Sequence, residues 1–217
     1  MKLAIHHKPR ANYTDTWQQM KQVVSTGELA LDQLWLLEHS PVFTQGIAGK
    51  PHHIIQQSNI PVVQSDRGGQ ITYHGPGQMM AYTLLKMKNH GIGPRQLVNQ
   101  LQRTTIKTLK QFDIEATCRE GAPGVYVANK KIASIGLRIK KGISYHGLAL
   151  NVDMNLKPFN SINPCGFAGL KMCQIKDFHP NITMEEVKSR FADDFIEIFG
   201  YTHYQVQNLK EPTDAIL

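Results

Sequence analysis

Cysteine is scarce in this 217-residue sequence, and the positions of its cysteines exclude two common uses. Cys118, Cys165 and Cys173 form an odd number and contain no C-x-x-C pair, which argues against a disulfide framework and a structural zinc site. The ten histidines include two adjacent pairs, whose side chains diverge, but no H-E-x-x-H motif. We therefore expect free thiols and no metal site.

Long apolar runs are also missing. No apolar stretch approaches the length that a membrane span requires, and the first eight residues, MKLAIHHK, lack the apolar region of a signal peptide. The sequence predicts a cytoplasmic protein that does not associate with a membrane.

Acidic residues are outnumbered, with 24 Lys and Arg against 17 Asp and Glu, a net charge of +7. This excess favours acidic partners, of which nucleic acid is one. The basic residues are scattered, however, and neither a zinc finger nor an RNP-like aromatic motif is present. We expect no nucleic-acid partner and an acidic protein partner instead; a basic RNA-binding module is the alternative from a non-enzyme class.

The chain is long enough for one sizeable core and contains no Pro/Ser-rich linker, so a single domain over residues 1–217 is expected. Period-2 and period-3.6 patterns predict a chain of strands and helices, with a meander of three strands after the second helix. Strands are expected at 3–6, 33–39, 42–46, 60–63 (buried), 79–87, 124–127, 131–139, 143–152 and 201–206, and helices at 14–24, 93–112 and from a capping box at 183 to a glycine stop at 200; the last ten residues are expected to be frayed.

Lys131 opens the strand KIASIGLRI, and alternation places it on the same face as Ala133, Ile135 and Leu137. The side chain could simply extend to solvent from the end of the sheet. A buried lysine beside a thiol could instead stabilise a thiolate as a cation, or move a proton as a neutral amine, because desolvation disfavours the ammonium form.

Cys165 lies between Pro164, which fixes one backbone angle, and Gly166, which permits conformations that a side chain would block. The sequence therefore predicts a thiol presented on a rigid turn. A buried cysteine without a function is the alternative.

A third unusual stretch contains four glycines within the ten residues 68–77. It matches neither a P-loop nor a Rossmann motif. The glycines indicate either close approach of a ligand to the backbone or a hairpin with bulged ends.

Four motifs occur in one order: RGGQITYHGPGQ at 67–78, KIASIGLRI at 131–139, YHGLALNV at 145–152 and NPCGFAG at 163–169. Together they closely resemble the lipoyl(octanoyl) transferase family, whose members move an octanoyl group from acyl carrier protein onto lipoyl domains. The match runs from about residue 36 to residue 169. It implies the fold of biotin and lipoate protein ligases, similar to class II synthetases: one α/β (α+β) domain with a mixed, largely antiparallel sheet flanked by helices.

The resemblance also implies site residues. The acyl-thioester nucleophile falls on Cys165, and the acid/base lysine that lowers the pKa of that thiol falls on Lys131; His146 is a plausible support for the pocket. The substrate-binding segments fall on Arg67, Gly68, Gly69, Gln70, Ile71, Thr72, Tyr73 and His74, on Ser134, Ile135 and Gly136, and on Gly147, Leu148 and Ala149.

The implied reaction needs no cofactor, neither ATP nor metal, because acyl carrier protein supplies an activated phosphopantetheine thioester. The implied partners are octanoyl-acyl carrier protein, the lipoyl domains of 2-oxoacid dehydrogenase acyltransferases and the glycine cleavage H protein. Two enzymatic alternatives remain: an ATP-dependent lipoate or biotin ligase, which would need no nucleophilic cysteine, and a cysteine hydrolase, whose base would be His74 or His146.

Overall fold

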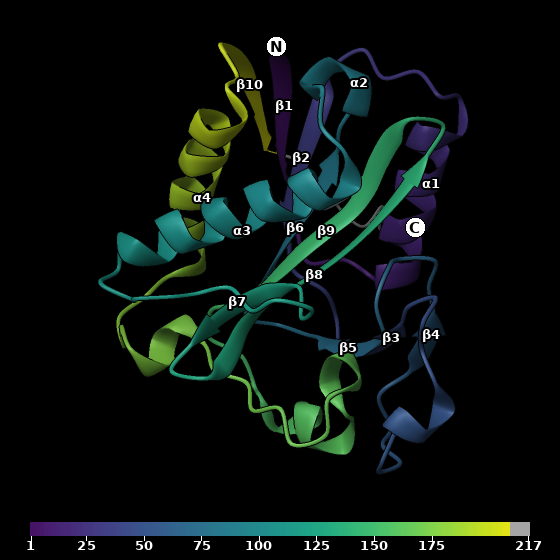
Figure 1. Cartoon of the computed structure of the whole chain (residues 1–217), viewed down its shortest axis with the longest axis vertical. Helices are drawn as coiled ribbons and strands as arrows, with labels where there is room; N and C mark the ends of the chain where they lie inside the picture. Colours follow the sequence, from purple (N-terminus) through teal and green to yellow (C-terminus); the bar gives the residue numbers. More distant parts are fainter. Residues whose placement is uncertain (209–217) are drawn as a thin grey trace, which may run out of the picture.

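The computed structural model describes residues 1–208, and its centre is a seven-stranded mixed sheet. The strand order is β10-β1-β2-β6-β9-β8-β7; β1 pairs in parallel with β10 and with β2, and the remaining neighbours are antiparallel (Figure 1). This agrees with the predicted mixed, largely antiparallel sheet. The strands are β1 Lys2–His7, β2 Asp32–Leu37, β6 Gln78–Leu84, β7 Gly124–Val127, β8 Lys130–Lys140, β9 Ile143–Asn151 and β10 His203–Asn208.

A second sheet of three strands was not predicted as a separate unit. It has the order β4-β3-β5, with β3 Val42–Gln45, β4 Val62–Gln64 and β5 Ile71–His74. The prediction of a buried strand at 60–63 is wrong, because β4 is an edge strand and Val62 is 49% exposed. An apolar run next to a proline is compatible with such an edge, where half of the backbone groups have no strand partner.

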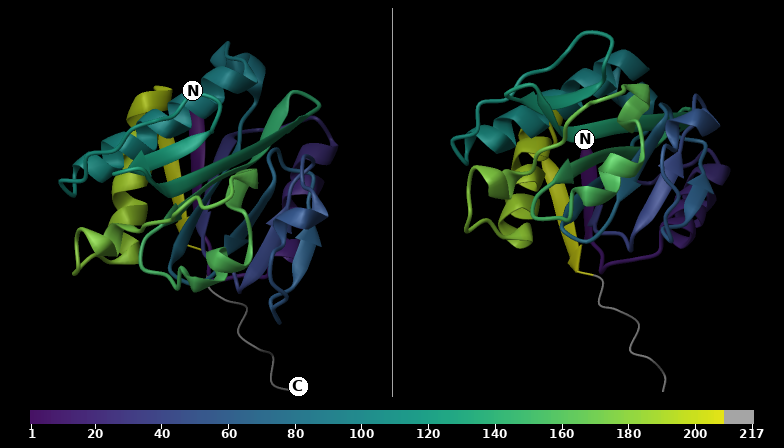
Figure 2. Two further views of the ribbon diagram at one scale, coloured as in Figure 1. Left: turned by 60° about the horizontal axis from the view of Figure 1, so that its bottom comes forward. Right: turned by 90° about the horizontal axis from the view of Figure 1, so that it is seen from below.

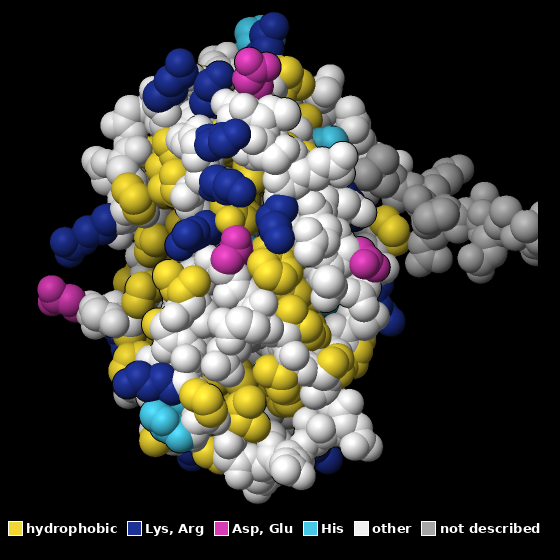
Figure 3. Space-filling model, turned by 90° about the vertical axis from the view of Figure 1, so that its right-hand side faces the viewer, with side chains coloured by type: hydrophobic (Ala, Val, Ile, Leu, Met, Phe, Trp, Pro, Cys, Tyr) yellow, Lys and Arg dark blue, Asp and Glu magenta, His cyan; other side chains and the backbone are white. Residues whose placement is uncertain are grey.

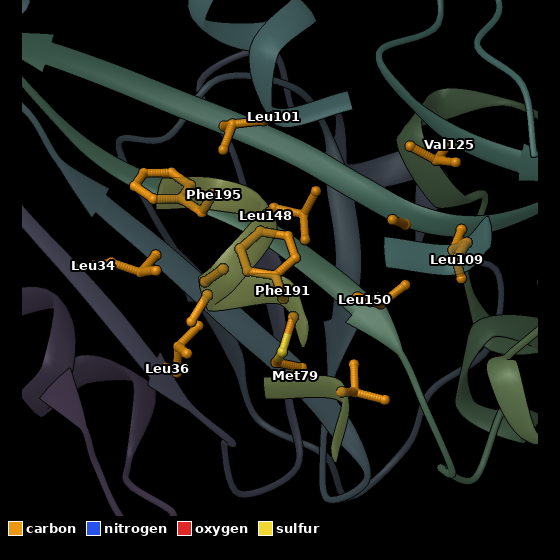
Figure 4. Packing of buried hydrophobic residues seen from close by; sticks show 14 of the residues in the cluster. Leu34, Leu36, Met79, Leu101, Leu109, Val125, Leu148, Leu150, Phe191 and Phe195 are labelled. Atoms are coloured by element: carbon orange, nitrogen blue, oxygen red, sulfur yellow. The ribbon is translucent and has the colours of Figure 1, made fainter. Parts of the chain in front are cut away.

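Two long helices cover one face of the large sheet (Figure 1): α3 Pro94–Lys110 and α4 Met184–Phe199. Alternate strand residues such as Leu34 and Leu148 point toward Phe191 and Phe195 of α4, as Figure 4 shows. The capping box predicted for α4 is present, since Thr183 accepts a hydrogen bond from the amide of Glu186.

The opposite face of the large sheet packs against α1 Tyr13–Ser25. Trp35 and Leu37 alternate along β2 with the residues that face α4. They lie on the opposite face of the sheet and pack against Met20 and Val24 of α1. The two faces therefore follow from the period-2 pattern of the strands.

Short helical turns connect the strands. They are α2 Met87–His90, η1 Pro51–His53, η2 Lys157–Ser161, η3 Pro164–Gly166 and η4 Ile175–Asp177. The strand predicted at 79–87 ends earlier, because Met87 begins α2. In Figure 2 the segment with η2 and η3 lies beside β5 of the small sheet.

The predicted edge strand near the end of the chain is β10, whereas residues 209–217, which complete the expected 1–217 domain and most of its frayed end, lie outside the described residues. Within residues 1–208, none of the helices combines the length and apolarity needed to cross a membrane.

Candidate active site

The side chains of Lys131 and Cys165 meet. Lys131 Nζ lies 3.0 Å from Cys165 Sγ and donates a second hydrogen bond, of 2.9 Å, to the carbonyl oxygen of Pro123. Lys131 is only 1% exposed, and no carboxylate of residues 1–208 forms an ion pair with it. The sulfur is therefore the one potential anion in contact with this amine among the described side chains.

Main-chain bonds place Lys131. Its amide donates to Lys171 O (2.9 Å) and its carbonyl accepts from Cys173 N (3.0 Å), so the segment that follows the Cys165 turn is fastened to β8. On the other side, a Cβ at Gly124 would overlap the end of the Lys131 side chain and the carbonyl oxygen of Ala133. Only glycine at this position leaves room for the amine.

Cys165 occupies a strained turn. Its φ of 56° and ψ of 19° lie in the left-handed region, which is uncommon for residues with a side chain. Gly166 N donates to Asn163 O, and a Cβ at Gly166, where φ is +80°, would overlap the side chain of Gln70. The prediction of a thiol on a rigid turn agrees with this geometry, and strain of this kind is characteristic of functional positions.

A cavity of about 610 Å³ opens at the two side chains and is large enough for a small acyl chain. The structure brings most of the predicted substrate-binding residues to its wall. These are Arg67, Gly68, Gly69, Gln70, Thr72, His74, Ser134, Ile135, Gly136, Gly147, Leu148 and Ala149, together with His146. Ile71 and Tyr73 alternate with them along β5 and point into a separate apolar cluster with Phe43 and Phe159.

The glycine-rich loop joins the two sheets. Gly68 N donates to Leu137 O (2.9 Å) on the part of β8 that continues beyond β7, and a Cβ at Gly136 would lie 2.9 Å from Gly68 O. The glycines therefore permit close approach of two backbones beside the cavity. The alternative of a hairpin with bulged ends is wrong, because β5 pairs with β3 and β6 pairs with β2 and β9.

Arg67 is buried and is held by neutral oxygens. Its Nε and Nη2 both donate to Thr44 Oγ1, Nη1 donates to Gly68 O and Nη2 donates to Gln70 O. Within residues 1–208 it forms no ion pair with a carboxylate. The guanidinium thus shapes the glycine-rich loop and adds positive charge to the cavity wall.

His74 supports Arg67 through Thr44. Gln78 Nε2 donates to Asn151 Oδ1, so Gln78 Oε1 accepts from His74 Nδ1, and His74 Nε2 accepts from the Thr44 hydroxyl. Burial holds the pKa of His74 well below its usual value. His74 is therefore a neutral part of a hydrogen-bonded chain, and this arrangement does not suit a general base for Cys165.

His146 belongs to a different group of polar side chains. Its Nε2 bonds to Asp66 Oδ1 (2.8 Å), and Tyr145 and Trp17 donate to the same carboxylate. Burial tends to raise the pKa of Asp66, but these hydrogen bonds outweigh burial and lower it. Burial lowers the pKa of His146, so an Asp66 carboxylate faces a neutral imidazole.

Sequence reasoning missed several residues of the cavity wall. Met80 and Tyr82 come from β6, Tyr13 comes from α1, and Pro94 and Val98 come from the start of α3. The alternation of β6 could have identified Met80 and Tyr82 as one face. The contributions of α1 and α3 depend on how helices pack across the sheet, which no local pattern reports.

Comparison with known proteins gives a consistent family. A family model described as "Lipoyl protein ligase A/B catalytic domain" matches residues 12–196. A protein of Legionella pneumophila (strain Corby) named "Octanoyltransferase" is 52% identical over 198 residues, covering 91% of this chain and 100% of that protein. A Vibrio cholerae protein of the same name is 49% identical over 200 residues, covering 92% of each.

Solved structures share the fold at low sequence identity. The bipartite lipoate protein ligase of Thermoplasma acidophilum has a TM-score of 0.76 at 13% identity, covering 97% of this chain and 88% of that chain. Biotin protein ligase from Aquifex aeolicus has a TM-score of 0.56 at 13% identity, covering 92% and 69%. The predicted biotin/lipoate ligase-like fold is confirmed.

Proposed function

This chain belongs to the lipoyl protein ligase A/B catalytic domain family and is an octanoyltransferase of lipoate biosynthesis, and we propose that it carries the octanoyl group on Cys165 as a thioester. The observation that supports this mechanism is the 3.0 Å contact between Lys131 Nζ and Cys165 Sγ at the wall of the cavity. An amine and a thiol at this distance can share a proton.

In the first half-reaction, the Cys165 thiolate attacks the carbonyl carbon of an octanoyl thioester. A new C–S bond forms to Cys165, the C–S bond to the donor breaks, and the departing donor thiolate takes a proton from the Lys131 ammonium. The acyl chain occupies the cavity, where Met80, Leu148 and Ala149 provide apolar surface.

In the second half-reaction, the amine of a target lysine attacks the Cys165 thioester. Lys131, now neutral, accepts the proton that the attacking nitrogen loses, an amide forms, and the Cys165 thiolate is released. A thioester is more activated than an amide, so this step proceeds without ATP, and the mechanism requires neither a nucleotide nor a metal.

The substrates include lipoyl-domain proteins, in line with the octanoyltransferase relatives and the lipoate ligase fold. We propose octanoyl-acyl carrier protein as the donor, and the lipoyl domains of 2-oxoacid dehydrogenases and the glycine cleavage H protein as acceptors, in the cytoplasm. Positive charge supports acidic partners: Lys and Arg side chains gather over the upper part of the face that carries α1 (Figure 3).

Intact-mass analysis tests the covalent step. After incubation with octanoyl-acyl carrier protein, we expect the mass to increase by one octanoyl group, the adduct to map to Cys165, and hydroxylamine to remove it. Cys165→Ser should lose the thioester adduct and more than 10²-fold of the transfer rate. Cys118→Ser is the matched control, because Cys118 is exposed and lies outside the cavity wall, and it should behave as wild type.

The ligase alternative gives the opposite result. A Cys165→Ser variant that keeps full activity and requires ATP would overturn the proposed mechanism and favour adenylate chemistry on the same fold.

A further inference from the structure

A second hollow adjoins the acyl cavity at the active site. It has a volume of about 490 Å³, and we call it the Tyr126 groove. Ala122 and Phe167 line both hollows, and Phe167 lies two residues after Cys165. The remaining wall includes Arg119, Tyr126, Lys130, Leu170 and Lys171.

The charge of the groove has one sign. Arg119, Lys130 and Lys171 line it, and no Asp or Glu does. Within residues 1–208 none of these three cations forms an ion pair. Lys130 and Lys171 are exposed, so their ammonium groups are available to an anion from solution.

Tyr126 connects the active site with these cations. The centroid of its ring lies 5.5 Å from Lys131 Nζ and 4.4 Å from the guanidinium carbon of Arg119. Arg119 also donates to the backbone and side-chain oxygens of Asn129, which orient it at the groove. The Tyr126 ring is therefore near both the Lys131 amine of the active site and the Arg119 cation of the groove.

We propose that the Tyr126 groove binds the phosphopantetheine arm of the acyl donor, with the phosphate among Arg119, Lys130 and Lys171. When the thioester carbon is at Cys165 and the acyl chain fills the cavity, the other side of the thioester must leave by a separate path. That path must accept an arm with amides and apolar carbons that ends in an anion. The wall of the groove includes the polar Asn129, the apolar Leu170 and three cations. This inference rests on the proposed function, and it commits to a carrier protein as the source of the arm.

Arg95 is a second candidate for contact with the phosphate of the donor. Arg95 is exposed and lines the acyl cavity at the start of α3. It is a single charge, whereas the Tyr126 groove has three, and Phe167 on the wall of that groove lies two residues after Cys165. Arg95 is therefore the natural comparison in an experiment.

Two donors that differ only in the phosphate test the inference: octanoyl-phosphopantetheine and octanoyl-pantetheine. We expect wild type to have the lower KM for the phosphorylated donor. Arg119→Met, Lys130→Met and Lys171→Met should each raise that KM about 3- to 5-fold, the size of an exposed ion pair, and should leave kcat and the KM for octanoyl-pantetheine unchanged. Lys2→Met, on β1 across the large sheet, should change neither constant, and Arg95→Met should leave the ratio of the two KM values unchanged.

Each other outcome overturns the inference. Equal KM values of wild type for the two donors, or a phosphate effect lost in Arg95→Met but kept in the groove variants, would place the phosphate elsewhere while leaving the proposed function intact. Failure of both donors to acylate Cys165 would overturn the proposed function itself. A higher kcat/KM with octanoyl-coenzyme A than with octanoyl-carrier protein would refute the carrier protein as the source.

Discussion

Lys131 and Cys165 are 34 positions apart in the chain, yet their side-chain nitrogen and sulfur lie 3.0 Å from each other. Strand β8 holds the amine and the turn η3 holds the thiol. The fold thus brings together the two side chains that we propose as base and nucleophile.

Two replacements of Lys131 distinguish the effect of its positive charge from the effect of its ability to accept a proton. Lys131→Met should reduce octanoyl transfer by about 10²- to 10⁴-fold, the usual contribution of a general acid–base. Lys131→Arg keeps a cation but cannot become a neutral base at neutral pH. We expect Lys131→Arg to accumulate acyl enzyme and to transfer it slowly, as measured by rapid-quench mass analysis. Equal rates of both half-reactions in Lys131→Arg and wild type would contradict the proton-transfer role.

Loss of the Thr44 hydroxyl should lower the free energy of unfolding by more than loss of an ordinary buried threonine hydroxyl does. Thr44→Val removes the acceptor of two Arg67 hydrogen bonds and the donor to His74. Leaving these buried groups unsatisfied should lower the free energy of unfolding by about 2–4 kcal/mol. Thr105→Val is a matched control, because the equally buried Thr105 hydroxyl donates only to Leu101 O within α3, and it should cost about 1 kcal/mol. Urea unfolding of both variants measures the difference, and equal losses would refute the importance of the Arg67 chain.

Gly147 is needed for space and not for an unusual backbone angle. A Cβ at this position would overlap the carbonyl oxygen of Ala81 on the neighbouring strand β6. Gly147→Ala should therefore cost about 2–3 kcal/mol of unfolding free energy, because two paired strands must shift. Gly142→Ala, in a turn with φ of +76° and open space, should cost only the backbone term of about 1 kcal/mol. The reverse order in thermal or urea unfolding would show that β6 and β9 can separate easily.

Stability should fall between pH 6.5 and pH 4. Burial lowers the pKa of His39 from 6.5 to about 4, and it lowers the pKa of His74 as well. Above pH 6.5 both are neutral in the folded and unfolded states; as the pH falls, the unfolded chain binds protons first and is favoured. His39 alone should account for roughly 3 kcal/mol at pH 4. Urea unfolding across this range should show the loss, and His39→Gln should have a shallower pH dependence. An unchanged slope in that variant would assign the effect to other groups.

Salt should weaken the encounter with an acidic donor more than the chemistry that follows. The net charge of +7 attracts acidic proteins. At 0.1 M salt, dissolved ions largely screen the attraction between exposed charges that are more than about 10 Å apart. We expect kcat/KM for octanoyl-acyl carrier protein to fall between 0.05 and about 0.3 M salt while kcat changes little. A flat kcat/KM would exclude charge steering.

Much of the architecture was predictable because its signals are local. The β7–β8–β9 meander followed from alternation and turn residues, and α4 followed from its capping box and glycine stop. The exposure of β4 was mispredicted because burial depends on which strand lies beside it. The small sheet was missed for the same reason, since β3 and β5 pair across the 25 intervening residues 46–70.

The site was predictable only in part. The alternation of apolar residues placed Lys131 on the apolar face of its strand, and the flanking proline and glycine identified Cys165 as a turn residue. Their contact could not be derived, because it depends on the pairing of Lys131 with Lys171 and Cys173. The Arg67–Thr44–His74 chain is similarly non-local, since it joins β3 to the glycine-rich loop.

The pairing of Lys131 with Lys171 has a consequence for the proposed transfer of an acyl group between two different proteins. The peptide between Cys165 and Lys171 is anchored at both ends, by the η3 turn and by β8, while Phe167 between them is 46% exposed. These two anchors therefore hold the distance from sulfur to amine, while the exposed Phe167 side chain is available for contact with an incoming protein.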